Sequence, residues 1–424
     1  MATLSLFTTV VLLLVLGSWT QATTTDIHVA KRQTEWDLSE CATRCLTALI
    51  PSSGCEATGL ECLCAAQDIQ ADVTDCVQAN CTVIEALETK RVQDTTLCPQ
   101  PIRNQAGITQ DINGALFGIA AAAVVARLLS RLPFVGGSGF GWDDYTILLS
   151  LALLVPLDVL LHLMTLHGLG QDIWMVPPSN ITTVLYYFWI DEFLYTFILA
   201  TTKISILLLY IRMWPDTDSQ KFRNACLTLI VILATYSITM NVVLAAGCAP
   251  ISYSWTRWDG QHKGHCISSR AQIFATASLN IIFGLLVFLF PLPKLVKLSF
   301  SSTRKKYTLC LTFLVGLVVT ICIVVRLQYL TVWGDSANLT RSYNPIAIWS
   351  NLECNLSVIC ACVPALAGLA QRLWAYLFGG SRSSSYGSGS HSDRKYGLRV
   401  RSQSSSSWDR QLGGGAHTPT AKKG

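Results

Sequence analysis

The chain has 424 residues, of which 51% are hydrophobic and only 13% are charged. A soluble domain carries about a quarter charged residues, so this composition excludes a single soluble globule. It also excludes disorder along the whole length, because too much apolar sequence would be left solvated. The net charge of +5 is mild, and we expect no nucleic-acid partner. The chain is therefore predicted to be a polytopic membrane protein.

The first segment is an apolar run from Leu4 to Trp19, followed by small residues. Its length is typical of the hydrophobic region of a signal peptide and short for a membrane span. We expect a signal peptide over 1–22, with cleavage after Thr20-Gln21-Ala22. The n-region has no Lys or Arg, so an additional transmembrane helix is the alternative.

Half of the 16 cysteines fall in one stretch of the chain. An even count at this density in a secreted segment predicts a disulfide framework whose pairing the spacing leaves open. Cross-links would replace the core that so small a segment cannot build. Zinc is disfavoured because the stretch has no CxxC pair. Helical spacing at 35–49 and 82–92 predicts short stapled helices. The eight residues are Cys41, Cys45, Cys55, Cys62, Cys64, Cys76, Cys81 and Cys98.

Long apolar runs follow Pro99, and their lengths suit a hydrocarbon core of about 30 Å. The predicted fold is an all-α seven-helix membrane bundle at 111–372, with a small disulfide-rich helical domain at 36–99 outside. Lys and Arg gather in the loops on one side, which favours an extracellular N-terminus and a cytoplasmic C-terminus. The predicted spans are 112–131, 144–166, 184–211, 225–247, 270–292, 308–331 and 345–368.

The predicted outer loops carry two further signals of an oxidising, extracellular side. Asn180 and Asn338 begin glycosylation sequons, both close to the membrane. Cys248 and Cys266 bracket an outer loop, and we expect them to form a disulfide. The segment 379–424 is rich in Gly and Ser, which predicts a disordered cytoplasmic tail.

The cysteine spacing, with Cys62-Leu63-Cys64 and Asn80-Cys81-Thr82, resembles the CFEM domain of fungal extracellular membrane proteins. In haem-binding members, the resemblance places an axial Asp three residues before the fourth cysteine. Here that position is Gly59, which offers no ligand atom. The resemblance therefore implies the scaffold, while haem is disfavoured and no cofactor or metal is expected.

The membrane segment resembles the fungal GPCR-like surface-sensing receptors, many of which carry a CFEM domain. The resemblance implies a plasma-membrane receptor for an extracellular ligand or surface, signalling through a heterotrimeric G protein at the basic loops near 212–223 and 294–306. The motifs that carry it are Gly141-Trp142-Asp143-Asp144-Tyr145, Gly168 to Trp174, Asp191 to Arg212, Pro291 to Leu295 and Trp349 to Pro364.

Ionisable side chains inside predicted spans are costly and mark functional sites. Asp158, Glu192, Arg326 and Glu353 all fall about 10–12 Å below the predicted outer helix ends. They predict a polar site open to the outside, either a structural network around Arg326 or a ligand pocket. Lys203 lies deeper and is expected to tie spans together, and the pair Asp143-Asp144 is expected to cap a helix start.

No enzyme is expected, because the sequence has no Gly-x-Ser-x-Gly, no His-Glu-x-x-His and no phosphate-binding loop. Two other functions compete with the receptor. One is a membrane-tethered haem or iron capture protein, against which Gly59 argues. The other is a small-solute carrier, against which an odd number of spans without an evident repeat argues.

Overall fold

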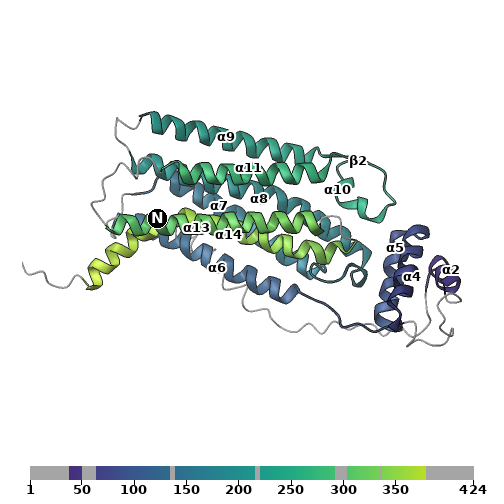
Figure 1. The fold of residues 1–424 in the computed structure, drawn as a ribbon. Helices are drawn as coiled ribbons and strands as arrows, with labels where there is room; N and C mark the ends of the chain where they lie inside the picture. Colours follow the sequence, from purple (N-terminus) through teal and green to yellow (C-terminus); the bar gives the residue numbers. More distant parts are fainter. Residues whose placement is uncertain are drawn as a thin grey trace, which may run out of the picture.

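The computed structural model describes residues 38–49, 64–133, 139–214, 220–291, 303–333 and 337–378. Long helices form a bundle, and a small helical domain lies beside one end of it (Figure 1). We name this end of the bundle the cysteine-rich end and the opposite one the far end. The predicted signal peptide, the tail, Gly59, Cys55 and Cys62 lie outside the described residues.

The small domain is made of short helices joined by disulfides. Its helices are α2 (Glu40–Leu49), α4 (Gln67–Asn80), α5 (Val83–Val92) and the π-helical turn η2 (Gln93–Leu97). Helix α5 starts at a capping box, in which Thr82 and Glu85 satisfy each other's backbone amides. The described disulfides join α2 to α4 and to the residue after α4, and the segment before α4 to the residue after η2. They are Cys41–Cys81, Cys45–Cys76 and Cys64–Cys98.

Seven long helices of the described residues make the bundle, and they cover the predicted spans with several extensions. Helices α6, α8 and α14 each begin six residues before the predicted span, and α14 ends ten residues after it. Six helices are long and apolar enough to cross a membrane, while 316–331 of α13 is a shorter apolar stretch. The helices are α6 (Ala106–Arg131), α7 (Trp142–Leu166), α8 (Pro178–Met213), α9 (Gln220–Ala245), α11 (Ser269–Leu289), α13 (Thr303–Trp333) and α14 (Leu339–Phe378).

The centre of the bundle is formed by α6, α7, α8 and α14. Ala120, Ala121 and Ala123 of α6 are buried there. Small residues let helix backbones approach closely inside a membrane. The Ala-rich part of α6 is therefore its packing surface against larger side chains such as Leu154 and Val358.

The loop between α9 and α11 is a disulfide-closed hairpin at the cysteine-rich end. Strands β1 (Cys248–Ala249) and β2 (His265–Cys266) pair antiparallel, and Cys248 and Cys266 form the disulfide expected from the sequence. Between them lie α10 (Tyr253–Thr256) and the 3-10 turn η6 (Arg257–Asp259). In η6, burial raises the pKa of Asp259, but hydrogen bonds from Gln261 and His262 outweigh it and leave that pKa below its ordinary value.

The small domain contacts the bundle through the loops at the cysteine-rich end. Leu87 of α5 packs into an apolar cluster with Ile173 and Trp174 of the 3-10 turn η4 (Ile173–Met175) and with Trp258 of η6. The ammonium group of Lys90 lies 5.8 Å from the centre of the Trp174 ring. Through these contacts the small domain packs against the hairpin and against the loop after α7.

The chain segment that leaves the small domain is fastened by an ion pair. Arg103 donates two hydrogen bonds to the buried Asp172, at 3.0 and 3.1 Å. Asn338 donates to the same carboxylate and accepts from the backbone amide of Ile173. The loop that carries Asp172 turns at Gly168 and Gly170, which both have positive φ. The linker, the loop after α7 and the start of α14 are thereby joined.

Candidate functional site

A chain of buried polar side chains crosses the bundle and begins at the ion pair of Glu192 and Arg326. Arg326 of α13 is 5% exposed, and its guanidinium lies 3.2 Å from both carboxylate oxygens of Glu192 on α8. The same guanidinium donates to the hydroxyls of Ser350 and Tyr195, at 2.6 and 3.1 Å. A buried cation needs such partners, because an unpaired one would be very costly in a membrane.

Tyr195 connects the ion pair of Glu192 and Arg326 to α14. Its hydroxyl donates to the carboxylate of Glu353 at 2.8 Å while it accepts from Arg326. Glu353 is completely buried, and its other oxygen accepts from the amide of Asn280 on α11 at 2.6 Å. Arg326 and Glu353 are therefore linked through one hydroxyl, and neither acid of the network is left without a donor.

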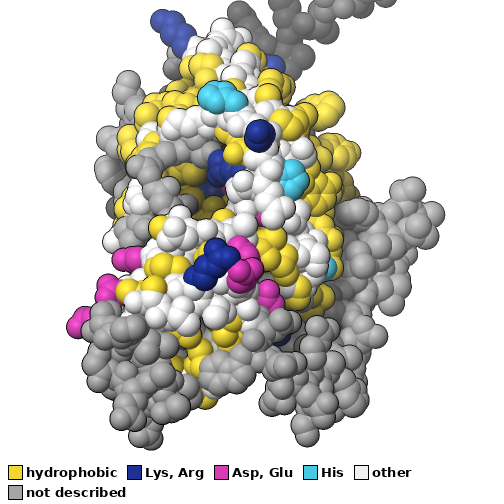
Figure 2. Space-filling view, turned by 90° about the vertical axis from the view of Figure 1, so that its right-hand side faces the viewer, with side chains coloured by type: hydrophobic (Ala, Val, Ile, Leu, Met, Phe, Trp, Pro, Cys, Tyr) yellow, Lys and Arg dark blue, Asp and Glu magenta, His cyan; other side chains and the backbone are white. Residues whose placement is uncertain are grey.

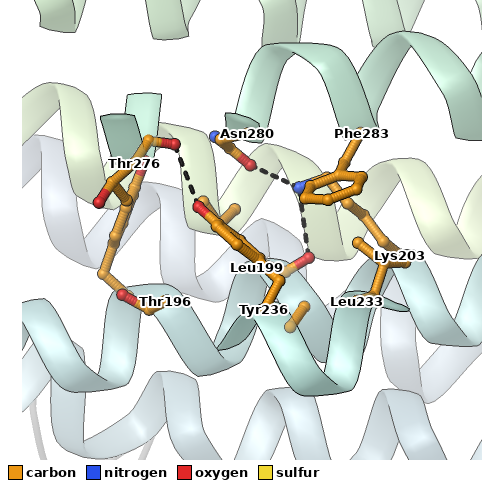
Figure 3. Close-up of a pocket in the computed structure, with 10 residues that line it drawn as sticks. Thr196, Leu199, Lys203, Leu233, Tyr236, Thr276, Asn280 and Phe283 are labelled. Atoms are coloured by element: carbon orange, nitrogen blue, oxygen red, sulfur yellow. Dashed lines mark hydrogen bonds between the residues drawn. The ribbon is translucent and has the colours of Figure 1, made fainter. Parts of the chain in front are cut away.

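Lys203 ends the chain on α8, as Figure 3 shows. Its ammonium group donates to the side-chain oxygen of Asn280 at 2.7 Å and to the carbonyl of Leu199 at 3.3 Å. The neighbouring cavity has a volume of about 10 Å³, room for a single water molecule. Lys203 thus ties α8 to α11, as predicted. We name the six residues the polar relay: Glu192, Arg326, Tyr195, Glu353, Asn280 and Lys203.

A larger cavity reaches the relay from the cysteine-rich end. Its volume is about 260 Å³, and α8, α9, α11, α13, α14 and the hairpin line it. Figure 2 faces this end and shows a hollow with hydrophobic side chains at its rim and basic groups within it. Glu192 is 24% exposed and lies in the wall with Arg326, so the cavity exposes the ion pair to any molecule that enters.

Aromatic side chains give this cavity walls suited to a small molecule with an apolar body. Phe188 and Trp189 stand on α8, about two turns before Thr196, and the ring of Tyr343 on α14 packs against Phe188. Trp258 lines the cavity from the hairpin, and its indole donates to the hydroxyl of Thr182 at 3.0 Å. Trp258 and Leu87 pack against the same buried cluster, so the cavity wall and the small domain share one apolar cluster.

A second charged site lies at the far end, where α6, α7 and α8 meet. Arg127 is completely buried and pairs with Asp143 at 2.8 Å and with Asp144 at 3.0 Å. Arg131 and Arg212 bind the same two carboxylates at 2.9–3.2 Å. Arg127 also donates to the carbonyl of Ala361 on α14. We name the three arginines and two aspartates the far-end ion cluster.

Comparison with known proteins assigns the helix bundle and the cysteine-rich domain to families. The model of the fungal rhodopsin domain matches residues 126–372, more than half of the chain. The chain belongs to the fungal rhodopsin domain family. The CFEM domain model matches residues 35–99, which confirms the resemblance of the cysteine framework. The match to the fungal rhodopsin domain includes the whole polar relay and the whole far-end ion cluster.

Curated relatives match slightly less than half of the chain at low identity. A SAT4 family membrane protein of Emericella nidulans is 24% identical over 200 residues, 47% of this chain and 50% of its own length. The Fugralins biosynthesis cluster protein 2 of Gibberella zeae is 24% identical over 197 residues, 46% of this chain and 48% of its own. The chain thus spans about half the length of the relatives it matches. No solved structure matches it.

The predicted four-residue polar site of the fungal rhodopsin domain is brought together only in part. Glu192, Arg326 and Glu353 share the relay, whereas Asp158 lies in a separate cluster and accepts from Asn351. The predicted depth was wrong for the two acids. Because α8 and α14 start early, Glu192 and Glu353 each lie fourteen residues, about 21 Å, from the helix start.

The expected cap at Asp143 and Asp144 is only part of their role. Asp144 does accept from the backbone amide of Gly141 before α7, at 3.1 Å. Both aspartates, however, mainly bind arginines that the sequence had assigned to other roles. Arg131 and Arg212 belong to this cluster, and Arg212 is thereby corrected from a charge of the proposed docking face at 212–223 to a partner of Asp143 and Asp144. Of that face, residues 294–302 and the side chains of 304–306 lie outside the description.

The sequence analysis assigned no role to three residues of the polar relay and the cavity wall. Tyr195 and Asn280 are neutral, so a search for charges inside spans passes over them. Trp258 lies in the outer loop between Cys248 and Cys266, for which only a disulfide was predicted. A search for polar side chains on the same helical face as Glu192 would have found Tyr195, three positions later.

Proposed function

We propose that this membrane protein is a plasma-membrane receptor that senses extracellular or surface cues and signals to a cytoplasmic heterotrimeric G protein. The observation that carries the proposal is the cavity that ends at a partly exposed ion pair of the polar relay. The CFEM domain would lie outside the cell, and the far end would face the cytoplasm. The proposal includes no catalytic step and no cofactor.

The relay offers a way to convert occupancy of the cavity into helix movement. A molecule that hydrogen-bonds to Glu192 would compete with Arg326, which also holds Ser350 and Tyr195. Weakening that pair would loosen α13 from α8 and redistribute the hydrogen bonds of Glu353 on α14. A ligand shifts such an equilibrium only through its differential contacts with the two arrangements, and the exposed carboxylate supplies them.

The CFEM domain supports sensing of surfaces as well as of small molecules. Leu87 of this domain and Trp258 of the cavity wall share one apolar cluster. A contact that moves α5 would therefore be transmitted to the cavity wall through this cluster. This coupling favours a receptor in which the outer domain modulates the bundle, rather than two independent modules.

The test is an energy-transfer assay between the chain and Gα subunits, with a second-messenger readout, in cells with and without the chain. Surface labelling is measured on the same cells. Arg326→Leu should reach the surface and lose coupling, because the exposed Glu192 stays partly solvated. Lys263→Gln, which removes an exposed loop charge, is the matched control and should couple normally.

Two results would contradict the proposal. Coupling that is the same in cells without the chain would exclude G-protein signalling. Normal expression and normal coupling of Arg326→Leu would exclude the relay as the signalling path. Loss of Arg326→Leu from the surface, with recovery in the double variant that adds Glu192→Gln, would assign the ion pair to stability alone.

A further inference from the structure

A second buried polar cluster, outside the relay, joins α6, α7 and α14. Its members are Asn113, Asp158, Asn351 and Asn355, which are 8%, 7%, 2% and 0% exposed. Asn113 donates to the backbone carbonyl of Asp158 at 3.2 Å, and Asn351 donates to its carboxylate at 2.7 Å. Asn355 donates to the side chain and backbone carbonyl of Asn351, at 2.6 and 3.0 Å. Contacts on three helices therefore bring four side chains to one place.

The hydrogen bonds of this cluster leave an excess of acceptors. All three amide groups already donate to other oxygens. Oδ2 of Asp158, Oδ1 of Asn113 and Oδ1 of Asn355 are buried, and none of them meets a donor in the described part of the chain. Buried polar atoms normally have partners, and each exception needs an explanation. Here three oxygens, one from a carboxylate, share the same deficiency.

We infer that this cluster binds a monovalent metal cation, sodium in preference to the larger potassium. The ligands would be the unpartnered oxygens of Asp158, Asn113 and Asn355. Carboxylate and amide oxygens are the donors that hard cations take in proteins. The inference does not depend on the receptor role, and it concerns none of the residues of the relay.

Charge and bond counting select a monovalent cation over other occupants. The three ligands carry one formal negative charge, so a monovalent cation leaves the site neutral, whereas a divalent cation would leave net charge in a low-dielectric interior. A proton on Asp158 would provide one O–H donor and leave other oxygens unpaired. A water molecule donates twice but does not neutralise the carboxylate. The tight packing around side chains less than 9% exposed favours the smaller alkali cation.

The test uses the full-length protein in nanodiscs of uncharged lipid, with sodium chloride, potassium chloride or choline chloride at equal ionic strength. Binding to the folded state alone raises the unfolding temperature by mass action. We expect a saturable rise of a few degrees with sodium, a smaller one with potassium and none with choline. Radiolabelled sodium should bind at one equivalent per chain.

Asp158→Asn should fold and lose both the sodium-dependent rise and the bound equivalent. Glu353→Gln, which changes a different buried acid, should keep them. If Asp158→Asn does not fold, Asn113→Leu replaces it, and its half-saturating sodium concentration should rise about tenfold or more. Equal unfolding temperatures in all three salts would overturn the inference. So would a sodium response that persists in Asp158→Asn, or a response of the wild type to pH alone, which would assign the site to a proton.

Discussion

Replacing Asp144 by Asn should destabilise the bundle far more than replacing Arg131 by Gln, although both remove one charge from the far-end ion cluster. The cluster holds three arginines and two aspartates, so its net charge is +1. Asp144→Asn raises that charge to +2 around the completely buried Arg127. Arg131→Gln lowers it to zero and leaves each carboxylate with Arg127 and Arg212.

The expected losses in the free energy of unfolding follow from this count of charges. Removing one partner of a buried ion pair costs about 3–5 kcal/mol, because a charge is left uncompensated. Arg131 is 13% exposed, and its loss removes hydrogen bonds without creating an excess charge, so about 1–2 kcal/mol is expected. The double variant returns the cluster to +1. It should therefore recover about 1–2 kcal/mol relative to Asp144→Asn alone.

The assay is the unfolding temperature of the purified variants in one detergent, together with the fraction of each at the cell surface. Expected stability falls from wild type to Arg131→Gln, then the double variant, then Asp144→Asn. Equal losses for the two single variants would refute the charge inventory. A double variant whose loss is the sum of the single losses would show that the two residues do not interact.

Three further predictions test other parts of the molecule. Cys64→Ser removes the bond to Cys98, worth about 2–5 kcal/mol in a small secreted domain, and should retain the protein in the secretory pathway, as glycan-trimming and surface labelling would report; normal surface levels would make that bond dispensable. Gly141→Ala should lower the unfolding temperature, since a Cβ there would lie 2.5 Å from Asp143 and 2.6 Å from Arg212. Its comparison is Gly139→Ala, where nothing lies within 4 Å and only the positive φ opposes the change; an unchanged Arg212 interaction in a Gly141→Ala structure would contradict the steric reason. The purified chain should give no saturable Soret shift with haem, because Gly59 lacks a ligand atom, and a shift at micromolar haem would contradict this.

Local patterns predicted most of the fold but little of the charged sites. Apolar runs located the helices, and cysteine spacing located the CFEM domain, because both signals are contained within short stretches of sequence. The seven-span count stays a prediction, since six helices meet the criterion of length and apolarity among the described residues. The early starts of α8 and α14 were missed because polar residues precede their apolar runs.

The ion cluster shows why the rest could not be predicted. Arg127 interrupts an apolar run, so it reads as a defect of the first span. Its partners lie 16 and 17 residues away on the next helix, and the carbonyl that it binds belongs to Ala361, 234 residues away. Only the packing of α6 against α7 and α14 brings these groups together. Helical periodicity predicts on which face of its helix a side chain lies, but it does not predict which other helix packs against that face.

The far-end ion cluster distinguishes two groups of helices in the bundle, those that it joins and those that it does not. It fastens α6, α7 and α8 to one another and, through Ala361, to α14, whereas no side chain described on α9, α11 or α13 takes part in it. The large cavity lies along this division, with α8 and α14 on one side and α9, α11 and α13 on the other. A molecule that enters the cavity would therefore contact both groups of helices at once, and only the group that contains α8 and α14 is also joined by the buried ion pairs at the far end.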